Sequence, residues 1–352
     1  MNNFIRIGSL FSGIGAFEQA VKKAKIKHKI IFANDIDKFV KKSYDANYKY
    51  RDWYDDICKM DGKKYMNKID ILVGGSPCQS FSIAGKRKGL DDKRGQLIKE
   101  YIRIISEVKP KVFIFENVKG LLTLYSGAVW EKVRRMFSKL KYDLHYKILN
   151  AKDYGIPQNR NRLFLIGFKN KTKFIFPKPI KLKYKMADFL DKVFYDDYAV
   201  SKKAARGITN KQRLKKKFTQ INGEIALCQA RCQEYNLRGD FVTKEYIKKF
   251  ILSDKLQKTV LRYGKPDGEI AKTILSTNYK YHYASRDNYI SVNKSNIRRL
   301  TPRECLRLMG FPDDFKIVVN NMQIYKQSGN SIVVNVLYYI LLQICKSMKW
   351  IR

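Results

Sequence analysis

Short apolar segments alternate with helix-like segments over the first part of the chain, and this alternation constrains the fold more than any other feature. Segments rich in β-branched and aromatic residues predict strands at residues 5–11, 30–33, 69–74, 112–116 and 163–167. Helical patterns, such as those at residues 16–24 and 130–140, lie between them. Strands that are apolar on both faces suit a parallel sheet covered on both sides. The sequence therefore predicts a doubly wound, mostly parallel α/β sheet of the Rossmann type.

The pattern changes after about residue 175, where Pro177 and Pro179 interrupt it. Residues 201–217 contain eight basic residues and no acidic one, and the chain stays irregular and rich in Lys, Tyr and Asn up to residue 297. A helical pattern returns at Thr301, where Thr-Pro-Arg-Glu is typical of a helix start, and a last helix is expected over residues 330–346. We expect a first domain over 1–178, a smaller second domain over 179–297 and a segment over 298–352 that returns to the first.

The charge of the chain is strongly positive: 72 Lys and Arg stand against 32 Asp and Glu, a net +40. Such a charge favours a polyanionic partner, nucleic acid first, although a solvated lysine-rich surface is the open alternative. The longest apolar run, residues 332–344, is short for a membrane span. The six cysteines form no C-x-x-C pair, so we expect no bound metal and reduced thiols. Together with the short apolar run, this predicts a cytoplasmic protein that binds no membrane.

A glycine-rich turn follows the first predicted strand. Phe11-Ser-Gly13-Ile14-Gly15 precedes a helix, so its backbone can approach a ligand closely. Asp35 follows the second strand and is placed to hold ribose hydroxyls, and Asp56 can accept from an adenine amino group. The missing third glycine argues against a dinucleotide and leaves S-adenosylmethionine open. An ordinary glycine turn with two surface acids fits these residues equally well.

A cysteine follows the next strand at a tight exit, Gly75-Ser-Pro77-Cys78-Gln79. A cysteine at the carboxyl end of a parallel strand lies in the ligand crevice of such a fold, and a basic surround favours its reactive thiolate. Residues 78–96 then form a glycine-punctuated loop with basic residues that suit a lid over a phosphate backbone.

A carboxylate ends the following strand, at Glu116-Asn117. Partial burial there raises a carboxyl pKa and suits a general acid. Arg160 and Arg162 precede the next strand and can pair with Glu116, substrate or phosphate. Taken singly, a buried cysteine, a capping Glu and surface arginines explain these residues as well; their occurrence at successive strand ends favours a site.

The chain resembles the bacterial DNA (cytosine-5)-methyltransferase family over residues 5–170 and 298–346. Six segments are similar to family motifs and occur in the family's order: Phe11-Ser-Gly-Ile-Gly15, Gly74-Gly-Ser-Pro-Cys-Gln79, Glu116-Asn-Val118, Gln158-Asn-Arg-Asn-Arg162, Arg298-Arg-Leu-Thr-Pro-Arg-Glu304 and Gln327-Ser-Gly-Asn-Ser331. The resemblance implies that residues 1–178 are the catalytic and cofactor-binding domain and residues 179–297 the target-recognition domain. Six ordered motifs are far more specific than any one of them.

The resemblance also implies roles for individual residues. The predicted cofactor contacts are Phe11 on the adenine, Asp35 on the ribose, where many members have Glu, Asp56 on the adenine, and further Gly13, Ile14, Gly15, Ile36, Ile57, Pro77, Asn330 and Ile332. Cys78 would attack carbon 6 of a flipped-out cytosine, and Glu116 would bond the ring, supported by Arg162 and Arg160. The predicted DNA contacts are Gln79, Ser82, Lys86, Arg94 and Thr273.

The function expected from this resemblance is sequence-specific methylation of double-stranded DNA at cytosine carbon 5, with S-adenosylmethionine as donor and S-adenosylhomocysteine as product. A tRNA cytosine-5 methyltransferase on the same scaffold and a non-catalytic DNA-binding paralogue are the alternatives. We expect a monomer without a metal, and the resemblance suggests a restriction endonuclease as functional counterpart.

Overall fold

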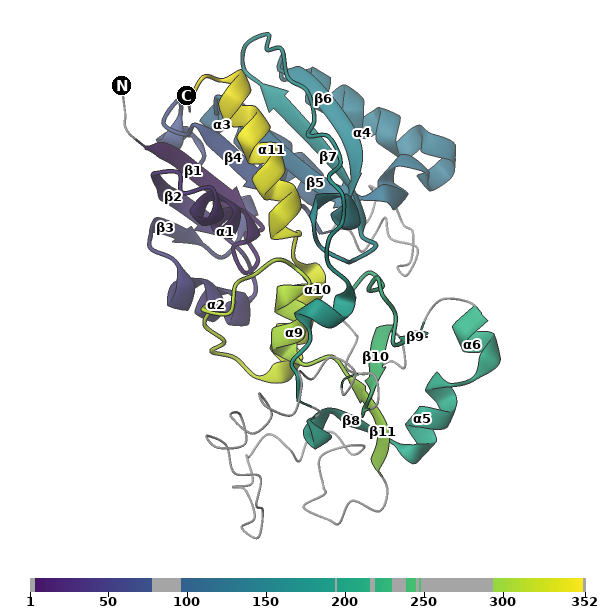
Figure 1. Ribbon diagram of the computed structural model, residues 1–352. Coiled ribbons are helices and arrows are strands. Elements are labelled where there is room, and N and C mark those ends of the chain that lie inside the picture. The colour runs from purple at the N-terminus through teal and green to yellow at the C-terminus, as the bar shows by residue number, and fades with distance from the viewer. Residues whose placement is uncertain are drawn as a thin grey trace.

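Seven strands form one large sheet in the computed structural model, in the order β3–β2–β1–β4–β5–β7–β6 (Figure 1). The structure describes residues 4–77, 96–193, 195–215, 219–229, 239–244, 247 and 294–350. The strands are β1 Ile5–Leu10, β2 His28–Asn34, β3 Tyr50–Tyr54, β4 Ile71–Gly74, β5 Val112–Val118, β6 Asp143–Asn150 and β7 Asn161–Phe168. The strands from β3 to β5 pair in parallel, and β7 is antiparallel to both neighbours. The predicted doubly wound, mostly parallel sheet is confirmed.

Helices cover both faces of this sheet. The helices α1 (Ala16–Lys23), α2 (Lys38–Asn47) and α11 (Val334–Ser347) contribute to the apolar core on one face, and α3 (Leu97–Val108) and α4 (Ala128–Ser138) to the core on the other. Helix α3 shows why: Ile98, Tyr101, Ile104, Ile105 and Val108 recur every three or four residues and are all fully buried. Short 3₁₀ helices span Ile57–Lys59, Lys63–Tyr65, Lys119–Leu122, Leu124–Gly127, Ala151–Tyr154, Met186–Phe189 and Asp196–Tyr198.

The register of the central strands places their carboxyl ends together. Leu10 pairs with Gly74, and Gly74 pairs with Phe115, so β1, β4 and β5 end at one edge of the sheet. Phe11, Gly75 and Glu116 each follow one of these paired positions. The parallel pairing therefore brings three of the sequence motifs to the same place.

Two strands and one helix boundary differ from the sequence prediction. The strands β3 and β6, at the two edges of the sheet, were not predicted, because their residues are mostly half-buried or exposed and lack an apolar run. The last helix begins at Val334, since Asn330 instead ends α10 (Asn321–Asn330) and Ser331 is extended. The stretch Asn321–Ser347 is apolar and long enough to cross a membrane, yet these two separate helices form it and Leu337, Ile340 and Ile344 are fully buried core residues.

A second, four-stranded sheet lies below the large sheet in Figure 1, in the order β8–β11–β10–β9. Its strands are β8 Ala199–Ser201, β9 Thr219–Ile221, β10 Gly239–Thr243 and β11 Lys294–Arg299, and the helices α5 (Lys202–Ile208), α6 (Lys211–Lys215) and α9 (Pro302–Arg307) adjoin them in sequence. We call this the small sheet. It has a separate apolar core that includes Val242, Leu300 and Leu308. The domain boundaries at 178/179 and 297/298 stay a prediction, and β11 spans the second of them.

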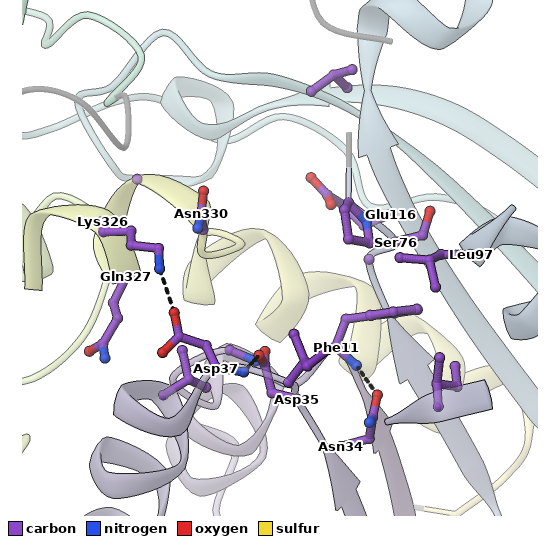
Figure 2. A pocket seen from close by; sticks show the side chains of 18 of the residues that line it. Phe11, Asn34, Asp35, Asp37, Ser76, Leu97, Glu116, Lys326, Gln327 and Asn330 are labelled. Atoms are coloured by element: carbon purple, nitrogen blue, oxygen red, sulfur yellow. Dashed lines mark hydrogen bonds and ion pairs between the residues drawn. The ribbon is translucent and has the colours of Figure 1, made fainter. Parts of the chain in front are cut away.

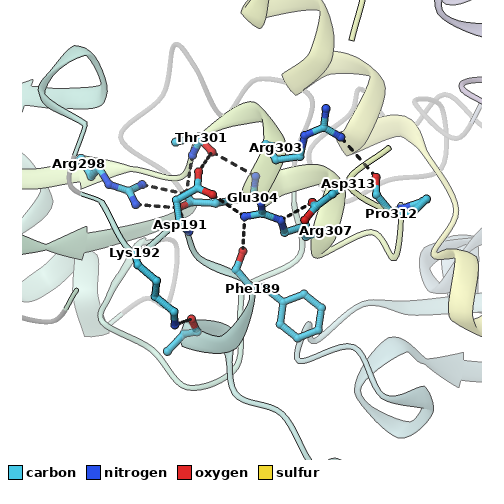
Figure 3. A network of polar contacts seen from close by, with 11 residues as sticks. Phe189, Asp191, Lys192, Arg298, Thr301, Arg303, Glu304, Arg307, Pro312 and Asp313 are labelled. Carbon is cyan, nitrogen blue, oxygen red and sulfur yellow. Dashed lines mark hydrogen bonds and ion pairs between the residues drawn. The ribbon is translucent and has the colours of Figure 1, made fainter. Parts of the chain in front are cut away.

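A buried polar network joins the small sheet to α9 (Figure 3). Arg298 of β11 forms an ion pair with Glu304 of α9 at 2.7 Å, and both side chains are fully buried. Thr301 and Glu304 form a capping box at the start of α9, with Pro302 in the first turn, as the sequence predicts for a helix start. Glu304 also accepts from the backbone N–H of Asp191, whose carboxylate pairs with Arg307 at 2.7 Å.

Candidate functional site

A cavity of about 380 Å³ opens at the carboxyl edge of the large sheet (Figure 2). Its walls come from residues that follow β1, β2, β4 and β5, with Arg160 and Arg162 from the start of β7 and Lys326 to Asn330 from α10. This is the crevice in which open α/β sheets bind their ligands. Its volume suits a small-molecule cofactor.

The turn after β1 forms the floor of the cavity. Phe11 and Gly13 both adopt a positive φ, of 48° and 54°, and both line the cavity. A Cβ atom placed on Gly13 would meet no heavy atom within 4 Å, so the space in front of this glycine is open to a ligand. Gly15 has a φ of 77°, and a Cβ there would fall 2.2 Å from the ring of Tyr48. Gly15 is thus required by the close packing of α1 against Tyr48.

An acidic edge follows β2. Asp35 accepts hydrogen bonds from the backbone N–H groups of Gly13 and Asp37, at 3.0 Å each. Burial raises the pKa of Asp35 above its ordinary value, although these two N–H groups lower it in part. Ile36 exposes its apolar side chain in the cavity wall, and Asp37 forms an ion pair with Lys326 of α10. The cavity therefore places a half-buried carboxylate beside an exposed apolar surface.

A buried carboxylate and an arginine face each other on the opposite wall. Glu116 at the end of β5 pairs with Arg162 of β7, with 3.1 Å between Oε1 and Nε. Burial raises the pKa of Glu116 above its ordinary value, because the charges of Arg162 and Arg160 offset that effect only in part. A Cβ on Gly75 would lie 2.7 Å from Oε2 of Glu116, so the glycine permits this close approach of β4 and the carboxylate.

Arg160 binds backbone carbonyls from two distant segments. Its Nη2 donates to the carbonyls of Gly329 and Ser331, at 2.9 and 2.7 Å, and its Nη1 donates to the carbonyl of Gln229 at 3.0 Å. These bonds hold the end of α10 against the cavity. Arg160 is thus built into the wall of the site, whereas Arg162 is the arginine that pairs with Glu116.

The exit of β4 leads to the predicted nucleophile. Asn117 donates to the side chain and backbone oxygens of Ser76, at 3.3 and 3.4 Å, which ties β4 to β5 just before Pro77. Cys78 is the next residue and lies outside the described residues. The predicted DNA contacts Gln79, Ser82, Lys86, Arg94 and Thr273 lie outside them too.

Most of the predicted cofactor residues surround one cavity: Phe11, Gly13, Asp35, Ile36, Asp56, Ile57, Pro77 and Asn330 line it. Ile332 lines an adjoining cavity of about 50 Å³. Ile14 packs in the core and Gly15 is the N-cap residue of α1. Neither residue lines these two cavities, and their cofactor contacts stay a prediction. The side chain of Asp56 caps the following 3₁₀ helix by accepting from the N–H of Cys58 at 3.0 Å.

Sequence reasoning missed several residues of the site. Asn34, buried at the end of β2, accepts from the N–H of Phe11 at 3.3 Å and donates to the carbonyl of Tyr54 at 2.8 Å. Asn34 adjoins the predicted contact Asp35, and Lys326 adjoins the motif at residues 327–331; this adjacency could have identified both residues. Cys228 lies beside the two arginines, 3.4 Å from Arg160 and 3.7 Å from Arg162, in a stretch that carries no motif.

Comparisons with known proteins agree with this geometry. A family model described as "C-5 cytosine-specific DNA methylase" matches residues 5–346. The type II methyltransferase M.HhaI of Haemophilus parahaemolyticus is 34% identical over 98% of this chain and 96% of its own length. The type II methyltransferase M1.ScrFI of Lactococcus lactis subsp. cremoris is 34% identical over 94% of this chain and 75% of its own length.

Solved structures share the fold. The Entamoeba histolytica methyltransferase EhMeth superposes with a TM-score of 0.70 at 17% identity, with 98% of each chain covered. The Dnmt2 methyltransferase of S. pombe gives a TM-score of 0.69 at 20% identity, covering 98% of this chain and 99% of its own. The family match spans nearly the whole sequence, and the predicted resemblance is confirmed: this chain belongs to the C-5 cytosine-specific DNA methylase family.

Proposed function

We propose that this DNA cytosine-5 methyltransferase methylates one cytosine within a short sequence of duplex DNA, through a covalent bond between Cys78 and the base. One observation carries the proposal. The Glu116–Arg162 pair and the exit of β4 that leads to Cys78 face the same cavity as Phe11 and Asp35. A base-binding acid and a cofactor pocket therefore adjoin each other at one edge of the sheet.

The cavity fits S-adenosylmethionine. Asp35 offers a carboxylate to ribose hydroxyls, Phe11 and Ile36 offer apolar surface to the adenine, and the open space at Gly13 admits the ligand close to the backbone. Asn330, at the end of α10, lines the same cavity, where it would contact the methionine part of the cofactor. The bound cofactor supplies a sulfonium-activated methyl group, which the cytosine takes up at carbon 5.

The chemistry of the base needs a nucleophile and an acid. In the proposed reaction the Cys78 thiolate bonds to carbon 6, which turns the ring into an enamine and makes carbon 5 reactive. Glu116 hydrogen-bonds the ring nitrogen and amino group as charge develops there. Its raised pKa supports this role, because a carboxyl that keeps its proton can donate one to the ring. Loss of the carbon 5 proton then expels the cysteine and restores the aromatic ring.

The target atom lies inside a stacked duplex, so the base has to be flipped into the cavity, a behaviour known for methyltransferases generally. Residues 78–96 would close behind it, and Gln79, Ser82, Lys86, Arg94 and Thr273 would contact the DNA. The net charge of +40 supports a grip on phosphates, with affinity that falls steeply as salt rises. We place the protein in the cytoplasm as a monomer, with a cognate restriction endonuclease as its functional counterpart.

Bisulfite sequencing of a plasmid incubated with the protein and S-adenosylmethionine tests the proposal. Protected cytosines within one short repeated context are the expected result, and they identify the recognition sequence at the same time. A protein that binds the cofactor but protects no cytosine would overturn the proposed substrate. Transfer of labelled methyl groups to tRNA would then identify the RNA-acting alternative.

A further inference from the structure

A short segment of the second half of the chain is bonded to the loop that carries the site arginines. We call residues 226–229 the strap. Ala226 pairs with Gln158 in a parallel bridge, its N–H donates to the carbonyl of Pro157 at 2.7 Å, and its carbonyl accepts from the N–H of Asn159 at 2.9 Å. Ala226 and Gln158 are fully buried. The strap therefore has one position relative to the loop that leads to Arg160.

The far end of the strap contacts both arginines directly. Arg160 donates to the carbonyl of Gln229 at 3.0 Å, and its Nη1 lies 3.4 Å from the sulfur of Cys228. Nη2 of Arg162 lies 3.7 Å from the same sulfur, while its Nε pairs with Glu116. A shift of the strap would therefore move the groups that surround the carboxylate of Glu116.

The buried carboxylate of Asp240 binds the strap from the side of the small sheet. Asp240 of β10 is 1% exposed, and its two oxygens accept from the backbone N–H of Leu227, at 3.2 and 3.1 Å. Gln220 of β9 donates to Asp240 at 3.0 Å and to the carbonyl of Ile225 at 2.8 Å. Asp240 and Gln220 thus connect the small sheet to the two residues that flank Ala226.

We propose that Asp240 is a positioning residue for Arg160 and Arg162, acting through the strap. Asp240 does not line the cavity. Its hydrogen bond fixes the position of Leu227, and Leu227 in turn fixes where Cys228 and Gln229 contact the two guanidinium groups. The inference rests on the proposed function and deepens it, since it names how the small sheet reaches the catalytic carboxylate.

The protonation state of Asp240 bears on this role. Burial raises the pKa of Asp240 to about 7, although the N–H of Leu227 and the side chain of Gln220 lower it in part. Among the described residues, the Cys305 thiol of α9 interacts with Asp240, and burial raises the pKa of that thiol well above its ordinary value. A proton on Oδ2 leaves Oδ1 to accept from Leu227 and Gln220, so the protonated form keeps both contacts. Because a pKa raised by burial means that the docked state favours the proton, the strap is held less firmly as pH rises through about 7.

The test uses Asp240→Ala and Asp240→Asn in the full chain, with Asp196→Asn, an exposed position, as the matched control. We expect Asp240→Ala to slow single-turnover methyl transfer by about 10- to 100-fold, as misplaced catalytic groups do, while the Kd for DNA changes by less than about threefold. Asp240→Asn keeps an acceptor oxygen and recovers part of the rate.

A second readout is independent of turnover. Desolvation of the sulfur on the side that meets the arginines raises the pKa of the Cys228 thiol, but the charges of Arg160 and Arg162 outweigh it and hold this pKa below its ordinary value. Cys228 is exposed, so iodoacetamide alkylation followed by mass spectrometry reports that pKa. Asp240→Ala is expected to move the alkylation profile of Cys228 to higher pH, because the arginines no longer lie beside the sulfur.

The outcomes separate this inference from the proposed function. A wild type that methylates no DNA contradicts the proposed function, while the alkylation profile still tests the strap. A folded Asp240→Ala variant with the wild-type rate, or a slow variant with an unchanged Cys228 profile, overturns the positioning role. If Asp240→Ala does not fold, Asp240→Asn decides, and a wild-type rate together with an unchanged Cys228 profile in that variant overturns the positioning role as well.

Discussion

The large sheet and the small sheet hold their residues in place by different means. In the large sheet, β4 is buried throughout and the first six residues of β5 are buried, and most of their side chains are apolar. The small sheet has strands of three to six residues, and its buried side chains include Arg298, Thr219 and Asp240. The large sheet is held by apolar area and strand register, and the small sheet combines a smaller apolar core with individual buried polar contacts.

This difference has a physical consequence. Apolar burial is non-directional, so the position of Glu116 follows from strand pairing and survives small changes of packing. A buried ion pair or carboxylate is directional, and it specifies one arrangement only while both partners are present. The chemistry is therefore placed by the sheet, whereas the link to the second half of the chain depends on a few polar anchors.

The largest expected effect is the loss of methyl transfer in Cys78→Ser, a substitution that leaves the folding of both regions intact. Cys78→Ser replaces the proposed nucleophile by a hydroxyl of much lower reactivity, so methyl transfer falls by at least about 10⁴-fold, or about 5.5 kcal/mol. DNA binding survives, as a gel-shift titration would show. Cys58→Ser, at an exposed position, is the control that keeps its rate. Retained turnover in Cys78→Ser would remove this residue from the mechanism.

The next largest effect is the loss of stability when the Arg298–Glu304 ion pair next to the small sheet is broken. Arg298→Met leaves Glu304 as an uncompensated buried charge, which costs about 3–5 kcal/mol of unfolding free energy. Urea unfolding measures the loss, and Arg206→Met on the exposed side of α5 is the control. Adding Glu304→Gln should recover part of it, because the amide oxygen still caps Thr301 without a charge. If Arg298→Met alone were as stable as the wild type, the distinction between the two regions would be contradicted.

A smaller effect tests the carboxylate that the large sheet positions. Glu116→Gln is expected to slow methyl transfer by about 10²-fold, the usual range for loss of a positioned proton donor. In the wild type the rate attributed to protonated Glu116 falls as pH rises through its raised pKa, and Arg162→Met, which removes a cation, moves this fall to higher pH. Stopped-time methylation assays from acid to alkaline pH measure the rate of Glu116→Gln and the pH at which the rate falls in the wild type and in Arg162→Met. A fall that moves to lower pH in Arg162→Met would exclude the pairing, and Glu131→Gln, exposed on α4, serves as control.

The same contrast explains what the sequence predicts well and what it does not. The strands β1, β2, β4, β5 and β7 are predictable, because each is a short apolar run between turn residues. Phe11 and Asp35 follow two of these strands and Glu116 lies near the end of β5, so their meeting at one edge is predictable from parallel pairing. The half-exposed edge strands β3 and β6 lack that signal.

The polar anchors escape prediction for another reason. Arg160 reaches carbonyls that lie 169 and 171 positions away, and Asp240 meets the N–H of a residue 13 positions before it. Neither contact leaves a local pattern in the sequence, because every residue supplies a backbone carbonyl and every residue except proline supplies an N–H. A motif predicts that Arg160 belongs to the site, but only the structure shows that it ties α10 to the strap.

The smallest expected effect falls on α10, which belongs to both regions. Its Ile324 packs in the core of the large sheet, while Tyr325 packs in the core of the small sheet and donates to the carbonyl of Leu300 at 2.6 Å. Lys326 pairs with Asp37 at the rim of the cavity, where both side chains are partly exposed. Lys326→Met therefore weakens cofactor binding by only about threefold, or about 0.7 kcal/mol, as a partly screened pair would, because the bonds from Arg160 still hold the end of α10. Calorimetric titration with S-adenosylhomocysteine measures this; a hundredfold loss would show that a single surface pair, and not the two cores, holds α10 over the cavity.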